Sequence, residues 1–152
     1  MALGVTSCTR KIVQAFKSPE LIKTFLHGHS FTANPIACAA SNASFKLLTD
    51  DACQVNIQRI SKQHKNFVLK HENKPIIRDI RSLGTILALE FETDHDSSYF
   101  SEMRNKLYPF FIERNILLRP LGNLIYMIPP YIITDEELEK VYTAIEEFLE
   151  LR

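Results

Sequence analysis

The sequence predicts a mixed α/β and α+β fold, with an α/β segment that opens the chain and a compact α+β layer in its second half. An apolar run at residues 1–6 is typical of a buried strand, and helical patterns follow it. The remainder combines helical periodicity with short alternating segments, which is typical of helices layered on an antiparallel sheet. With 152 residues, 45% of them hydrophobic, the chain is long enough to bury one ordinary core.

The first part is expected to form one strand and two helices. Thr9 can begin a short helix, and Asn34 with Pro35 can begin a second one, because Asn accepts the first free amides and Pro lacks an N–H. Residues 37–44 of that second helix carry only small side chains, so another element can approach closely. A buried strand at residues 1–6 normally needs neighbouring strands, so we expect further structure upstream of this sequence.

The second part is expected to open with a long helix and a hairpin. Asp50 or Asp51 can begin the helix, which should end before Pro75. Strands at residues 76–81 and 85–91 flank a short turn, and the second of them alternates apolar and polar positions. These features predict a half-buried antiparallel pair.

A second helix and strand pair are expected next, followed by a last helix. The helix that follows the hairpin should bend or break at Pro109. Strands are expected at residues 116–119 and 124–128, separated by turn-forming residues. Thr134 and Glu137 form a capping-box pattern, which predicts the start of the last amphipathic helix.

Charge, hydropathy and cysteine content exclude several classes of protein. Eighteen Lys and Arg residues balance eighteen Asp and Glu residues, and no basic stripe interleaved with aromatics is present, so no nucleic-acid partner is expected. No apolar stretch approaches the roughly 18 residues needed to span a bilayer, and no signal-peptide pattern begins the chain. Cys8, Cys38 and Cys53 form an odd, widely spaced set. We therefore expect a cytoplasmic protein without a membrane partner.

The loop before Asn34 is the first candidate site. Gly28, the Ser30 hydroxyl and exposed amides at a helix start can hold a phosphate or a carboxylate. A capped surface loop explains the same residues and is the better interpretation of them alone. His27 and His29 can suggest a metal, but no third ligand has a convincing spacing, so no metal site is predicted.

Arg119 is the second candidate, because it ends an apolar segment. A guanidinium is costly there without an anion, and its planar fork suits a carboxylate. An internal Asp or Glu partner explains it equally well. Tyr126 is a further candidate, although its sequence context alone favours a core tyrosine. No nucleophile, base and orienting group form a recognisable motif, so no catalytic residue is predicted.

Two of these segments resemble a known family. Residues 27–31 and 34–40 look like the loop and small-residue helix of class III pyridoxal-phosphate (PLP) aminotransferases. Residues 119–133 resemble, more narrowly, the C-terminal motif of the biotin-pathway subfamily that aminates 8-amino-7-oxononanoate. The resemblance covers only the C-terminal part of such an enzyme. It implies the end of the large PLP-binding domain at residues 1–48 and the small α+β domain at residues 49–152.

This resemblance also implies roles for the candidate residues. His29 and Ser30 would contact the phosphate of PLP in the neighbouring subunit of a homodimer, and Ser30 stands where the family commonly has Thr. Arg119 would bind the carboxylate of the oxo-acid. The residues implied to contact or border the substrate are Gly28, Arg119, Leu121 and Tyr126.

The reaction implied by the resemblance moves an amino group from S-adenosylmethionine to 8-amino-7-oxononanoate, with PLP as electron sink. Residues 1–6 resemble the strand that lies just beyond the family's Schiff-base lysine, so that lysine has no counterpart here. The chain alone is therefore expected to be inactive, without covalently bound PLP, and to require a homodimer partner or the missing N-terminal portion. The alternatives are a non-catalytic interaction or dimerisation module and a class III enzyme acting on another substrate, such as an ω-amino acid.

Overall fold

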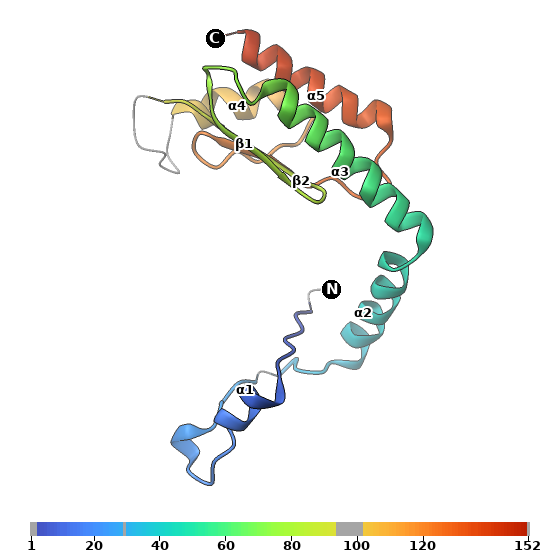
Figure 1. Ribbon diagram of the computed structural model, residues 1–152, viewed down its shortest axis with the longest axis vertical. Helices are drawn as coiled ribbons and strands as arrows, with labels where there is room; N and C mark the ends of the chain where they lie inside the picture. The colour runs from blue at the N-terminus through green and yellow to red at the C-terminus, as the bar shows by residue number, and fades with distance from the viewer. Residues whose placement is uncertain (1–2, 29, 94–101, 152) are drawn as a thin grey trace. The chain divides into compact units, whose positions relative to one another are not determined.

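The computed structural model describes residues 3–28, 30–93 and 102–151. The chain divides into two compact units, Met1–Asp50 and Asp51–Arg152. The first unit holds helix α1 (Arg10–Ala15), the short 3₁₀ helix η1 (Leu21–Lys23) and helix α2 (Pro35–Leu48), all visible in the blue to cyan part of Figure 1. The second unit contains the remaining helices and all the strands of the described chain.

The first unit has almost no core of its own. Ala37 is its single buried residue among those described. Large apolar side chains are instead exposed along the whole unit, and the most exposed of them include Val5, Ile22, Phe25, Leu26, Phe31 and Leu47. This unit therefore lacks the burial of apolar area that normally stabilises a helix in a protein.

Helix α2 begins where the sequence predicts. The Asn34 side-chain oxygen accepts hydrogen bonds from the amides of Ile36 and Ala37, both at 3.1 Å, and Pro35 occupies the first turn. This cap satisfies two amides that have no partner within the helix. The local prediction is thus confirmed even though the helix has little to pack against.

The strand expected at residues 1–6 is wrong for the residues described. Residues 3–9 have no regular secondary structure and are exposed. A buried parallel strand requires a neighbour to pair with. No strand exists within the described part of the first unit, so the apolar run has no strand there to pair with.

The second unit is a three-stranded antiparallel sheet covered by helices. Its elements are α3 (Asp51–His71), β1 (Ile77–Leu83), β2 (Ile86–Phe91), α4 (Glu102–Glu113), β3 (Leu124–Met127) and α5 (Asp135–Glu150). The strand order is β1-β2-β3, with Leu89 of β2 opposite Ile80 of β1 and Ile125 of β3. Helices α3 and α5 run side by side in Figure 1 and are joined by hydrogen bonds. One hydrophobic cluster joins all six elements.

The predicted hairpin and last helix are confirmed. Strands β1 and β2 pair as expected, and Gly84 in the turn between them has a φ of 57°, which favours glycine. The capping box of α5 is present, because Thr134 Oγ1 accepts from the Glu137 amide at 3.2 Å and Glu137 Oε2 accepts from the Thr134 amide at 2.9 Å. These elements follow from local signals alone.

Two expectations about the middle of this unit are wrong. Helix α4 continues through Pro109, so the predicted break is wrong, while the bend stays a prediction. Burial of Leu107 and Phe111 in the core offsets the roughly 3 kcal/mol that an interior proline costs. Residues 116–119 are not a strand, although Ile116 is buried and Leu117 exposed in the alternation of one. Their backbone pairs with no strand of the described sheet, which consists of β1, β2 and β3. Ser97 and Ser98, either of which the sequence offers as the start of this helix, lie outside the described residues.

Candidate functional site

A groove of about 490 Å³ in the second unit contains two of the candidate residues, Arg119 and Tyr126. Its walls come from residues 115–119, from β3 with the prolines that follow it, and from the start of α5. Most lining side chains are apolar, Leu118 and Met127 among them. The groove therefore combines a guanidinium with an apolar surface.

The side chain of Arg119 is exposed and has no anionic partner among the described residues. Within the described ranges, no carboxylate forms an ion pair with it and its guanidinium makes no hydrogen bond. The interpretation of Arg119 as the partner of an internal Asp or Glu therefore has no support among these residues. Its five N–H donors therefore have no partner among the described residues and can bind an anion.

Tyr126 and Leu121 are placed differently from each other. Tyr126 is half-buried, lies opposite Ala88 in the β2–β3 ladder and lines the groove. Leu121 is 43% exposed, forms an isolated bridge with Leu124 and is not a lining residue. The structure thus brings Tyr126 and Arg119 together and leaves Leu121 outside the groove.

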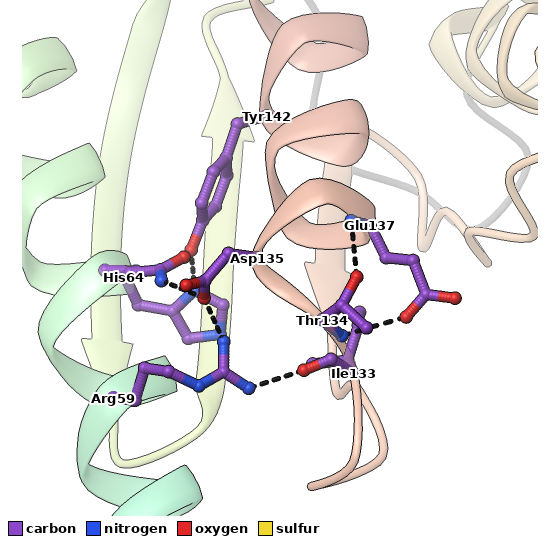
Figure 2. Close-up of polar contacts among 8 residues, drawn as sticks. Arg59, His64, Ile133, Thr134, Asp135, Glu137 and Tyr142 are labelled. Atoms are coloured by element: carbon purple, nitrogen blue, oxygen red, sulfur yellow. Dashed lines mark hydrogen bonds and ion pairs between the residues drawn. The ribbon is translucent and has the colours of Figure 1, made fainter.

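A hydrogen-bond network anchors the wall of the groove that leads into α5 (Figure 2). The guanidinium of Arg59, on α3, donates to the carbonyl of Ile133 and to the carboxylate of Asp135. Gln63, one turn later on α3, donates to the same carboxylate at 2.6 Å. Hydrogen bonds from Gln63 and Arg59 lower the pKa of Asp135. Because Ile133 lines the groove, α3 fixes the position of one of its walls.

Sequence reasoning did not identify this network. Arg59 and Asp135 are 76 residues apart, and Arg59 lies in no recognisable motif. Asp135 carries a local signal of another kind, since an acidic residue in the first turn of a helix interacts favourably with the helix dipole. That signal explains the residue without indicating its partner.

A second polar network lies inside the helix layer. His64 is fully buried, its Nδ1 is 2.6 Å from the Tyr142 hydroxyl, and its Nε2 is 3.2 Å from the Thr85 carbonyl. A carbonyl only accepts, so Nε2 carries the proton and Nδ1 accepts from Tyr142. Burial lowers the pKa of His64 and raises the pKa of Tyr142. Both groups are therefore neutral near pH 7, as befits a structural pair.

The loop before α2 is the other candidate, and it lies in the first unit. Gly28 is exposed, and a Cβ added there would meet no atom within 4 Å. Ser30 is exposed in a turn, whereas His29 lies outside the described residues. Asn34 already occupies the amides of Ile36 and Ala37. Among the described residues of this loop, the Ser30 hydroxyl is thus an exposed hydrogen-bond donor.

The described residues contain neither a metal-binding cluster nor a membrane-spanning helix. Across residues 3–28, 30–93 and 102–151, no three His, Cys, Asp or Glu side chains lie close enough together to hold a metal ion. No helix within those same ranges is both long and apolar enough to cross a membrane.

Curated relatives of this chain share a name. The adenosylmethionine-8-amino-7-oxononanoate aminotransferase of Synechococcus elongatus is 35% identical over 150 residues, which are 99% of this chain and 35% of the relative. The enzyme of the same name from Helicobacter pylori is 33% identical over 153 residues, covering 92% of this chain and 32% of the relative. The chain thus spans about a third of the length of these relatives.

Solved structures of transaminases share the fold. An ornithine aminotransferase from Toxoplasma gondii, whose active site was described with partial PLP occupancy, is 29% identical with a TM-score of 0.65, over 81% of this chain and 28% of that one. An ω-aminotransferase from Paracoccus denitrificans is 21% identical with a TM-score of 0.70, over 92% and 31%, and shows the fold alone. The family model for class III aminotransferases matches residues 1–149. The chain therefore belongs to the class III aminotransferases, which are PLP-dependent, and has the fold of a portion of such an enzyme.

Proposed function

We propose that this chain supplies the oxo-acid site of an aminotransferase that acts on 8-amino-7-oxononanoate in biotin synthesis. The observation that carries the proposal is Arg119, exposed in a largely apolar groove and unpaired within the described ranges. A nonanoate is a carbon chain ending in a carboxylate, which suits an apolar wall beside a guanidinium. Tyr126 borders the same space, and Leu121 is proposed to approach the substrate from the adjoining turn. The names of the relatives support this substrate.

The amino donor and the cofactor contacts are further parts of this proposal. S-adenosylmethionine is the donor that the relatives' names suggest. PLP, when bound, supplies the electron sink for amino transfer. His29 and the Ser30 hydroxyl would contact its phosphate, and the open space at Gly28 would leave room for cofactor and substrate.

The first unit suggests that the active enzyme is an assembly. Its exposed apolar side chains, Phe25, Phe31 and Leu47 among them, need a covering surface to become stable. We propose that this surface is a second copy of the chain or the polypeptide equivalent to the remaining two thirds of the relatives. The family's Schiff-base lysine has no counterpart in the 152 residues, so these residues alone would not turn over substrate. The proposed compartment is the cytoplasm.

Reconstitution tests this function most directly. The chain is mixed with a polypeptide equivalent to the remaining part of the Synechococcus elongatus relative, and PLP absorbance and amino transfer to 8-amino-7-oxononanoate are measured. We expect absorbance near the visible edge and turnover in the mixture but not in either part. A flat spectrum and no turnover in the mixture would favour the alternative function, a non-catalytic interaction module. Turnover with an ω-amino acid instead of the oxo-acid would favour a class III enzyme of different specificity.

The role of Arg119 is tested in the same reconstituted enzyme. Arg119→Ala removes a hydrogen bond between charged groups, worth about 1.5–3 kcal/mol, so KM for the oxo-acid should rise about 10- to 150-fold while PLP affinity is unchanged. Arg10→Ala, which removes the same charge from the exposed helix α1, is the control and should leave KM unchanged. An equal loss of oxo-acid and PLP affinity would contradict the assigned role.

A further inference from the structure

The Arg119 groove contains a second cation. Lys140, on α5, lines the same groove, and its side chain is exposed. Its ammonium group forms no ion pair or hydrogen bond within the described part of the chain. An ion pair with Glu136, one helical turn earlier on α5, could compete for this ammonium group. The structure does not form that ion pair. Two positive groups therefore border one groove without a partner from the described residues.

The carboxylate that lines the groove is already engaged. Glu137 is the one acidic residue among the lining side chains described, and it lies on α5 three residues before Lys140. Its Oε2 accepts the hydrogen bond from the Thr134 amide at 2.9 Å, as the second half of the capping box. The carboxylate is thereby directed toward the helix start instead of toward Lys140. The groove keeps an excess of positive charge.

The two cations differ in how they can hold an anion. Arg119 presents a planar fork that matches both oxygens of a carboxylate, whereas Lys140 is a compact charge on a long flexible stem. A lysine of this kind can reach a carboxylate oxygen from a second direction, and its stem can lie along apolar atoms such as those of Val141. The remaining apolar lining favours a hydrocarbon chain behind the charged end.

We propose that Lys140 is a specificity-determining residue of this groove, a second cation that selects a chain-like monocarboxylate over its neutral analogue. The inference rests on the proposed role of Arg119 as the carboxylate-binding residue. Lys140 contributes charge attraction, whereas Arg119 contributes two directed hydrogen bonds to the carboxylate. Loss of either residue should weaken binding of the monocarboxylate, and loss of Arg119 should weaken it more. The sequence alone did not single out Lys140, since a lysine on an amphipathic helix is an ordinary surface residue.

The test uses the full 152-residue chain and nonanoate as the probe, with methyl nonanoate as its neutral analogue. Binding is followed by NMR chemical-shift titration of the groove methyl groups and of the Lys140 ammonium. We expect nonanoate to bind and the ester to bind at least 10-fold more weakly. Lys140→Gln should weaken nonanoate binding about 3- to 10-fold without affecting the ester, and Lys140→Arg should restore most of it. No binding of nonanoate to the unchanged chain would overturn the proposal.

Two further variants separate this inference from the proposed function. Lys65→Gln removes the same charge from an exposed position of α3 outside the groove and should leave nonanoate binding unchanged. Equal weakening by Lys65→Gln and Lys140→Gln would reduce the effect to general surface charge and overturn the proposal. If Arg119→Gln weakens binding and Lys140→Gln does not, Lys140 has no such role and the proposed function stands. If neither variant changes binding, both proposals fail.

Discussion

The two units of this chain differ in what they can stabilise by themselves. The unit from Asp51 to Arg152 buries one continuous apolar cluster between a sheet and its helices. The unit from Met1 to Asp50 has three short helical segments and one buried residue, Ala37, among those described. Both contain a helix whose first turn is capped by a side chain, α2 in the first unit and α5 in the second. The comparison shows that local helix signals do not make a folding unit unless another surface covers the apolar face.

The largest expected difference between the two units is in the hydrogen exchange of their backbone amides. In the full chain, the amides of β2 should exchange only through global unfolding of the second unit, whereas those of α2 should exchange through local opening. Given an ordinary stability of about 5–15 kcal/mol, protection in β2 should exceed that in α2 by about 1,000-fold or more. Mass spectrometry of peptides from β2 and from α2 measures the two exchange rates. Equal protection would contradict the comparison. Adding the partner polypeptide should raise protection in α2.

A matched pair of phenylalanines gives the next largest effect. Phe111, on α4, is fully buried, while Phe45, on α2, is 64% exposed. Phe111→Ala should lower the free energy of unfolding by about 3–5 kcal/mol, because it removes apolar contacts and leaves a cavity. Phe45→Ala should change it by less than about 0.5 kcal/mol. Urea unfolding followed by circular dichroism measures both. A large effect of Phe45→Ala would show that the first unit has a core after all.

The buried His64–Tyr142 pair predicts a smaller effect and a pH dependence. Tyr142→Phe leaves Nδ1 of His64 without its donor and should cost about 1–3 kcal/mol. Tyr131→Phe, at an exposed tyrosine, is the control and should cost almost nothing. If Tyr131→Phe lowered the free energy of unfolding as much as Tyr142→Phe does, the structural role of the His64–Tyr142 pair would be contradicted.

The sign of the pH dependence follows from the lowered pKa of His64. The unfolded chain keeps the ordinary value of 6.5 and binds a proton more readily than the folded chain does. Stability should therefore be full above about pH 6.5 and fall as the pH decreases toward the lower folded pKa. The carboxyl groups with lowered pKa, such as Asp135 and Glu146, add a loss only at more acidic pH. A urea midpoint that is unchanged between pH 7.5 and 5.5 would contradict this.

The helix caps give the smallest and most selective comparison. Thr134→Ala removes the capping box of α5 and should lower the free energy of unfolding by about 1 kcal/mol. Asn34→Ala removes an equally formed cap from α2 and should leave the unfolding midpoint of the second unit unchanged. Chemical unfolding gives the first value, and local exchange rates in α2 report the second change. If Asn34→Ala shifts the unfolding midpoint of the second unit as much as Thr134→Ala does, the two units unfold together.

Local signals allowed much of the secondary structure of both units to be predicted. Asn34, Thr134 and Gly84 each act through hydrogen bonds or backbone angles within a few residues, so their effects can be read from neighbouring sequence. The family could also be predicted, because its motifs at residues 27–40 and 119–133 are contiguous. The roles of the proposed site residues stay predictions until the binding experiments are made.

The sequence by itself determined where most helices begin, which turn joins β1 to β2, and to which family the chain belongs. Only the tertiary structure decided that residues 116–119 form no strand, that α4 passes through Pro109, and that Arg119 and Lys140 share one groove. The physical reason is the sequence separation over which each interaction acts. Caps and turns act over three or four residues, whereas strand pairing, burial and the groove depend on segments that meet only when the chain folds.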